Sequence, residues 1–266
     1  MTGYPSAIGD GLVVAKRNLI KIKRVPDLLV FTTFQPIMFV LLFVYVFGGA
    51  IAVKGSNYNE FLIAGIFAQT VIFGSVITGA GLAEDIQKGI IDRFRSLPMS
   101  PSAVLFGRTL SDVVNNVIVV IVMSLTGLVV GWRIRTSFLE ALGGYLILLI
   151  FAYAFSWVMA MMGLLAPSPE VVNNAAFIVI FPLTFVANTF VPIVTLPAPL
   201  RTFAEWNPVS SVTQAARELF GNIPPHTPSP GWALQHPVTY TLMWSLAILV
   251  IFVPLTTRQF RRSVSR

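Results

Sequence analysis

The charged residues best placed to act together lie in one stretch, residues 81–108, between two long apolar segments. Its sequence is GLAEDIQKGIIDRFRSLPMSPSAVLFGR, and its charged members are Glu84, Asp85, Lys88, Asp92, Arg93, Arg95 and Arg108. Leu82, Ile86, Ile90 and Phe94 recur at every fourth position, which predicts one apolar stripe along a short amphipathic helix. Pro98 then ends the helix, because it has no backbone N–H. Such a helix is suited to docking a soluble partner, and a solvated loop helix without a partner is the alternative.

The sequence lacks the groups that most enzyme chemistry requires. It contains no cysteine and only two histidines, so we expect neither a thiolate nucleophile nor a metal site. It also lacks the glycine-rich phosphate-binding motif that ends in Lys-Ser or Lys-Thr, so the chain is not expected to hydrolyse ATP itself. We therefore expect no catalytic residue and no cofactor in this chain.

Ionisable residues are also missing from the interior of the apolar segments. Asp27, Asp112, Glu140 and Glu170 are all predicted at segment ends. A proton- or sodium-coupled transporter usually carries an ionisable residue inside the membrane, so the sequence disfavours that mechanism. If the chain transports a compound, the energy is expected to arrive mechanically from another subunit through the stretch 81–108.

The composition is typical of an integral membrane protein. Of the 266 residues, 55% are hydrophobic and 11% are charged, whereas soluble domains carry about 25% charged residues. Six segments are long enough to cross a hydrocarbon core as helices. They are Leu28–Gly49, Phe61–Ala80, Val113–Val130, Leu139–Leu165, Val171–Val191 and Val238–Thr257. The predicted fold is an all-α integral membrane protein with six transmembrane helices.

Two further groups of helices are predicted outside the spans. Residues 8–22 combine apolar residues at steps of three and four with Lys and Arg, which is typical of an N-terminal helix lying in the membrane interface. Before the last span, prolines and a second amphipathic pattern over residues 197–219 predict short helices in the outer leaflet.

The distribution of basic residues predicts the orientation. Thirteen of the eighteen Lys and Arg residues fall on the side that holds both termini and the stretch 81–108. Lys and Arg accumulate in cytoplasmic loops, so both termini are predicted in the cytoplasm, in a multi-pass protein of the cell inner (plasma) membrane. The net charge of +7 then suits anionic lipid, and no nucleic-acid partner is expected.

Amide side chains are prominent polar groups within the predicted spans. They could line a pathway, but such groups also join neighbouring helices, which is the interpretation we favour. The residues are Gln35, Gln69, Asn115, Asn116, Asn173, Asn174 and Asn188.

Two stretches together resemble one family of membrane proteins. LAEDIQKGIIDRFRSLPMSPSAVLFGR is similar to the cytoplasmic loop of ABC type-2 transporter permeases, with an acidic residue, a glycine and Leu-Pro-Met-Ser before Gly-Arg. FPLTFVANTFVPIVTLPAPLRTFAEWNPVSSVTQAARELFGN resembles the region after the fifth span, and most closely that of the daunorubicin/doxorubicin-resistance type. The resemblance covers essentially the whole chain and implies one transmembrane permease domain, residues 1–266, with a cytoplasmic coupling helix.

The resemblance also implies partners and site residues. It implies a separate ATP-binding cassette subunit, which would hold ATP and Mg, and a second permease copy or a homologue across a shared pathway. The positions that match the coupling segment are Glu84, Asp85, Gly89, Arg93 and Arg95. The positions that match the outer region are Asn188, Pro192, Pro208 and Arg217.

The function expected from these observations is that of a permease subunit of an ATP-driven exporter. Its substrates would be hydrophobic or amphiphilic compounds such as drugs or lipids, reached from the membrane lipid. Export of a lipid-linked glycan or a cell-wall lipid is the alternative within the same fold. A secondary transporter is disfavoured by the missing intramembrane charge, and a membrane-embedded enzyme by the lack of clustered His, Asp or Glu.

Overall fold

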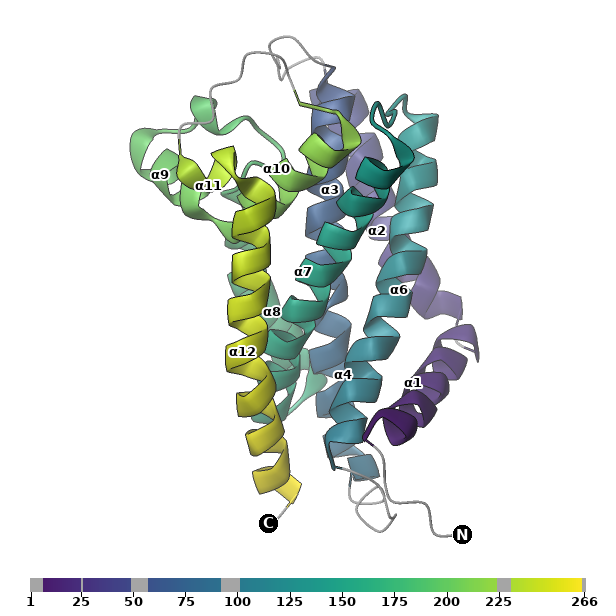
Figure 1. The fold of residues 1–266 in the computed structure, drawn as a ribbon. Helices are drawn as coiled ribbons and strands as arrows, with labels where there is room; N and C mark the ends of the chain where they lie inside the picture. The colour runs from purple at the N-terminus through teal and green to yellow at the C-terminus, as the bar shows by residue number, and fades with distance from the viewer. Residues whose placement is uncertain (1–6, 25, 49–56, 92–100, 224–230, 265–266) are drawn as a thin grey trace.

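The computed structural model describes residues 7–24, 26–48, 57–91, 101–223 and 231–264. Within these ranges the chain forms helices and no strands, so the all-α prediction is confirmed for the described residues. Figure 1 shows long helices side by side, with α1 (Ala7–Arg24) at one end of the bundle. Three short helices gather at the other end: α9 (Ala198–Trp206), α10 (Pro208–Phe220) and α11 (Trp232–Gln235).

Within the described residues, four helical segments are long and apolar enough to cross a membrane. They are the segment formed by α3 (Tyr58–Gly74) and α4 (Val76–Gln87), then α6 (Pro101–Val129), α7 (Phe138–Leu165) and α12 (Pro237–Val264). These coincide with four of the six predicted spans, which supports a multi-pass membrane protein.

The other two predicted spans correspond to shorter apolar helices, Thr33–Phe47 and Pro169–Phe185. The first lies in α2 (Pro26–Leu42) and the π-helical turn η1 (Phe43–Phe47), within the predicted Leu28–Gly49. The second is α8, whose 17 residues cover about 25 Å. The prediction extended this span to Val191, but α8 ends at Phe185, three residues after its internal Pro182.

The α3–α4 segment forms the centre of the bundle. In the most apolar 18-residue stretch of Tyr58–Gln87, 78% of the residues are buried. In the most apolar 18-residue stretch of α12, 17% are buried. The hydroxyl group of Ser75, between α3 and α4, donates a hydrogen bond to the carbonyl oxygen of Ile72 at 2.6 Å. A Gly-Ser pair at such a point is a common cause of a helix bend.

Glycines allow the central helices to approach closely. A Cβ at Gly79 in α4 would lie 2.5 Å from the carbonyl oxygen of Met159 in α7, and a Cβ at Gly163 in α7 would collide with the backbone of Gly79. A Cβ at Gly107 in α6 would likewise collide with the carbonyl oxygen of Gly11 in α1. These contacts fix α7 against α4 and α1 against α6, which is the packing that small residues permit in membrane proteins.

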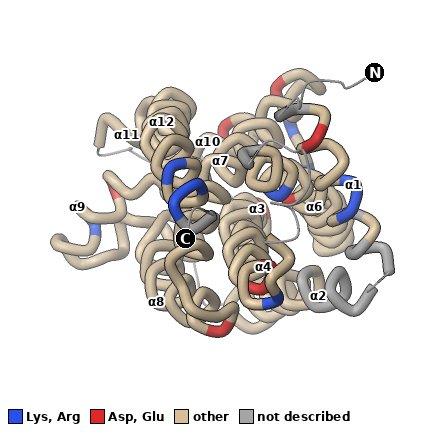
Figure 2. The backbone as a smooth tube through the Cα atoms, turned by 90° about the horizontal axis from the view of Figure 1, so that it is seen from below, with Lys and Arg blue, Asp and Glu red and all other residues tan. Residues whose placement is uncertain are grey.

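The end of the bundle that carries α1 is also its basic end. Figure 2, viewed from this end, shows Lys and Arg on α1 and at the end of α12. α1 packs along α6, with Val14 and Ala15 buried and Lys16 exposed. The described structure therefore contains an amphipathic helix where the sequence predicts the interfacial one.

Candidate functional site

The predicted coupling segment begins as the last turn of α4. The backbone N–H groups of Lys88 and Gly89 donate to the carbonyl oxygens of Glu84 at 2.9 Å and of Ile86 at 3.0 Å. Gly89 has φ = 64°, in the left-handed region, and a Cβ at this position would meet no atom within 4 Å. α4 therefore ends just before Gly89. Glycine adopts the left-handed conformation needed at a helix end without steric cost.

Glu84 and Lys88 form an ion pair on the surface of this turn, one helical turn apart. The hydrogen bond from the ammonium group of Lys88 to the Glu84 carboxylate raises the pKa of Lys88, so this lysine stays charged at neutral pH. Arg93 and Arg95, the other basic residues assigned to the coupling segment, lie outside the described residues.

The apolar stripe predicted along this segment does not form one buried face. Leu82 is fully buried, but Ile86, one turn later, is 38% exposed. α4 continues the central α3–α4 segment, so packing against α7, α8 and α6 decides which of its faces is buried. Phe94, the last member of the predicted stripe, lies outside the described residues.

Asp85 points into the protein, where it holds two arginines. Its Oδ2 atom accepts hydrogen bonds from Nη1 of Arg108 in α6 at 3.3 Å and from Nη2 of Arg17 in α1 at 3.2 Å. The carboxylate is nearly inaccessible, with 6% of its side chain exposed. Asp85 therefore ties three helices together within the chain, and this carboxylate is occupied before any partner docks.

Gly81 makes room for this ion pair. A Cβ at Gly81 would coincide with the guanidinium group of Arg108, which also donates to the carbonyl oxygen of Ile77 at 3.3 Å. The sequence analysis placed Gly81 and Arg108 in the charged stretch and Arg17 in the basic interfacial helix, but it did not predict that they meet at Asp85. The signal that could have found them is the charge balance, because a carboxylate buried in a membrane protein requires a basic partner on another helix.

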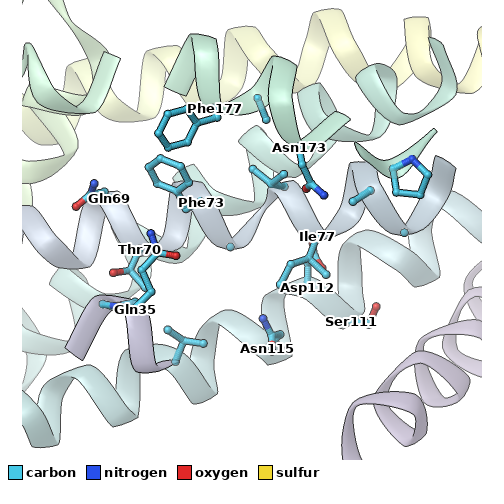
Figure 3. A pocket seen from close by; sticks show the side chains of 18 of the residues that line it. Gln35, Gln69, Thr70, Phe73, Ile77, Ser111, Asp112, Asn115, Asn173 and Phe177 are labelled. Atoms are coloured by element: carbon cyan, nitrogen blue, oxygen red, sulfur yellow. The ribbon is translucent and has the colours of Figure 1, made fainter. Parts of the chain in front are cut away.

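A cavity of about 610 Å³ lies beside this ion pair, between α2, α3, α4, α6 and α8 (Figure 3). Phe39, Phe73 and Phe177 contribute apolar surface to it. Its polar lining includes four of the amide residues singled out from the sequence, Gln35, Gln69, Asn115 and Asn173. These four line a space large enough for a drug-sized molecule. Asn116 and Asn188 instead pack against other helices, as the sequence interpretation favoured for the whole set.

Asp112 corrects the expectation that all ionisable residues lie at segment ends. The sequence placed it just before a span that starts at Val113, but the apolar helix starts ten residues earlier, at Ala103. Asp112 is 5% exposed and lines the cavity, and its Oδ2 atom has no hydrogen-bond partner among the described residues. The polar residues Arg108, Thr109, Ser111 and Asp112 interrupt the early turns of α6 and hid its true start, because their hydropathy is low.

The outer-region residues are brought together around α10. Arg217 is fully buried, and its guanidinium donates to the carbonyl oxygens of Phe61 at 2.9 Å and Thr189 at 3.2 Å. The same group lies 3.5 Å from the ring centre of Phe61. Burial lowers the pKa of Arg217, although an arginine starts from so high a value that the group stays charged at neutral pH. Arg217 thus joins α10 to the start of α3 and to the segment after α8.

Asn188 also binds α10, and Pro208 is part of that helix. Pro192 belongs to the segment between α8 and α9. The backbone N–H of Asn188 donates to the Ser210 hydroxyl at 2.9 Å, and its amide group donates to Gln214 at 3.0 Å. Pro208 occupies the first turn of α10, where no backbone N–H is needed. Pro192 precedes the short 3₁₀ turn η2 (Ile193–Thr195).

Asn207, which the sequence analysis treated as part of a chain break with Pro208 and not as a cap, fastens α10 to α8. Its side-chain oxygen accepts from the backbone N–H of Val209 at 2.9 Å, and its amide group donates to the carbonyl oxygens of Leu183 at 2.7 Å and Val186 at 2.9 Å. The last carbonyl groups of a helix lack partners within it, so Asn207 satisfies two acceptors at the end of α8. An Asn-Pro pair before an amphipathic pattern is the signal that could have identified this cap.

Comparison with known proteins gives a consistent result. Residues 11–220 match the ABC-2 type transporter family. The chain is 34% identical to the daunorubicin resistance ABC transporter permease protein of Streptomyces coeruleorubidus, over 96% of this chain and 87% of that protein. It is 25% identical to the doxorubicin resistance ABC transporter permease protein of Mycobacterium tuberculosis, over 77% of this chain and 70% of that protein.

Proposed function

The chain belongs to the ABC-2 type transporter family, and from this membership we propose that it is the permease subunit of an ATP-driven exporter of hydrophobic or amphiphilic drugs. The observation that carries the substrate class is its 34% identity, over 96% of its length, to a daunorubicin resistance permease. The cavity of about 610 Å³ supports the same class, because its mixture of aromatic and amide side chains suits an amphiphilic compound.

The proposed topology has six membrane crossings and both termini in the cytoplasm of the cell inner membrane. The crossings are α2 with η1, α3 with α4, α6, α7, α8 and α12. α1 lies in the cytoplasmic interface, and α9 to α11 lie on the outer side. The gathering of basic residues on α1 and at the end of α12 supports this orientation.

A separate ATP-binding cassette subunit, which binds ATP and Mg, supplies the energy by docking at the end of α4. Glu84, Lys88 and Gly89 form the accessible part of this docking surface. The resemblance to the family adds Arg93 and Arg95 to it. Asp85 transmits the motion inward, because it joins α4 to α1 and α6. A second permease copy or a homologue completes the pathway, and membrane lipid surrounds the apolar outer faces.

The test is drug efflux from cells that lack their own drug pumps. The chain is produced together with its ATP-binding cassette partner, and the control is the same pair with an ATPase that binds but does not hydrolyse ATP. Cells with the active pair should expel doxorubicin and the control cells should retain it. Equal retention in both, with the two subunits present in the membrane, would overturn the proposed function.

A further inference from the structure

The cavity contains a buried carboxylate, one oxygen of which has no hydrogen-bond partner among the described residues. Asp112 is 5% exposed, and its Oδ2 atom has no partner among the described residues. Nδ2 of Asn115, three residues later on the same face of α6, is also buried without an acceptor in the described structure. Both side chains line the cavity (Figure 3). An unmet acceptor and an unmet donor in one cavity indicate a ligand with polar groups of its own, because burying such atoms unpaired is costly.

The charge of the cavity wall favours a cation. The charged residues of its described lining are Glu84, Arg108 and Asp112. Glu84 forms an ion pair with Lys88, and Arg108 forms one with Asp85 and donates to the carbonyl oxygen of Ile77. Arg108 also attracts Asp112, but within the described residues Asp112 forms no ion pair of its own.

Aromatic rings occupy another part of the wall. Phe73 of α3 and Phe177 of α8 lie with ring centres 6.4 Å apart and planes inclined by 55°. Figure 3 shows the two rings next to each other. Rings inclined in this way offer apolar surface to an aromatic body and the faces to which a nearby cation is attracted.

We propose that this cavity is the cargo site and that Asp112 binds the ammonium group of an amphiphilic cation whose aromatic body rests against Phe73 and Phe177. The proposal rests on the exporter function proposed above and adds the recognition residue and the charge of the cargo. The ammonium group of the cargo donates a hydrogen bond to Oδ2 of Asp112, which has no donor among the described residues. Nδ2 of Asn115 donates to an oxygen of the cargo.

The first test compares doxorubicin, which carries an ammonium group and a flat aromatic body, with N-acetyl-doxorubicin, in which that charge is removed. Transport is measured in inverted membrane vesicles that contain the whole transporter. The unchanged transporter should prefer doxorubicin by about tenfold or more, the effect expected for one buried charge pair. Asp112→Asn should lose that preference while transport of N-acetyl-doxorubicin continues. If Asp112→Asn keeps the preference, the site is wrong although the exporter function stands.

The second test measures binding without transport. The chain has no cysteine, so one can be introduced at Asn173, which lines the cavity, or at the exposed neighbour Asn174, which does not line it. Doxorubicin should slow maleimide labelling of the Asn173→Cys variant and leave the Asn174→Cys variant unaffected. Adding Asp112→Asn should remove the protection of Asn173→Cys. Equal protection of both cysteines would overturn the site, whereas Asp112-dependent protection without any transport would overturn the exporter function alone.

Discussion

Two guanidinium groups share one carboxylate at the basic end of the bundle. Arg17 and Arg108 reach Asp85 from α1 and α6, and Gly81 leaves the space that Arg108 needs. Arg17 is partly exposed, with 39% of its side chain accessible, while Arg108 is mostly buried. The pair of Arg108 with Asp85 is therefore the stronger contact, because water screens it less.

Variants at Asp85 and Lys88 should separate internal stability from docking. Asp85→Asn removes the negative charge that the two guanidinium groups share and should destabilise the chain by about 3 kcal/mol, since a buried guanidinium loses its counter-charge. Lys88→Glu changes an exposed side chain and should leave the midpoint of thermal unfolding in detergent unchanged, yet reduce co-purification with the ATPase. If Asp85→Asn unfolds like the unchanged protein but loses the ATPase, Asp85 is itself a docking residue.

Gly81→Ala should displace Arg108. The added methyl group takes the position of the guanidinium, so the bonds to Asp85 and to the carbonyl of Ile77 are lost, at about 1–3 kcal/mol. The same change in an Arg108→Met background should cost much less, because the colliding group is absent. Equal losses in thermal stability in both backgrounds would mean that Gly81 is needed for another reason.

At this scale the sequence predicted that the stretch 81–108 is charged, but not where its charges point. Glu84 and Asp85 are neighbours in sequence, yet a helix turns them about 100° apart, so one pairs with Lys88 at the surface and the other with Arg108 inside. The partner of a buried charge lies on another helix, and helix packing cannot be read from spacing along one helix.

α10 is the element that holds the outer end of the bundle together. It carries Arg217, which reaches α3, and is capped by Asn207, which reaches the end of α8. At its other end, Gly221 takes φ = 72°, and the indole N–H of Trp132, after α6, donates to Asn222 at 2.7 Å. The segments before and after the predicted fifth span are thus fixed to one short helix.

Substitutions at Asn207 should rank by the bonds they keep. Asn207→Asp keeps the acceptor for Val209 but loses both donated bonds, whereas Asn207→Ala loses all three. A lost cap costs about 0.5–2 kcal/mol, so thermal stability in detergent should fall from Asn through Asp to Ala. If the Asp and Ala variants are equally stable, the cap contributes nothing and the bonds to α8 account for the whole effect.

The sequence predicted the elements of this outer region better than their lengths. The amphipathic pattern over residues 197–219 corresponds to α9 and α10, but the apolar run before it was assigned wholly to a span. Residues 187–190 are buried inside the protein, where a Cβ at Gly65 would collide with the backbone of Thr189. Hydropathy alone does not distinguish burial in protein from burial in lipid.

On the scale of the whole molecule, the two ends of the described structure carry different elements. α1, the end of α4 and the end of α12 lie at one end, and α9, α10 and α11 lie at the other (Figure 1). The ion pairs of Asp85 belong to the first end, and the buried guanidinium of Arg217 belongs to the second. This separation suits the proposed transporter, in which the ATPase docks at one end and cargo is released at the other.

Single cysteines should reveal which end faces outward. Gln87→Cys marks the exposed end of α4, and Thr202→Cys marks an exposed position on α9. In intact cells an impermeant maleimide should label Thr202→Cys only, and both variants should react once the cells are opened. Labelling of Gln87→Cys in intact cells would reverse the proposed orientation.

α8 is short for a membrane-spanning helix. Its 17 residues, Pro169–Phe185, reach about 25 Å, whereas α2 and η1 together continue from Pro26 to Phe47. A hydrocarbon core is about 30 Å thick, and lipid accommodates a short helix by thinning beside it. α8 contributes to the wall of the cavity, so we expect the bilayer to be thinner beside the proposed cargo site. We therefore expect the acyl-chain length of the lipid to affect the rate of export. Turnover should be faster in vesicles of short-chain phosphatidylcholine than in vesicles of long-chain phosphatidylcholine.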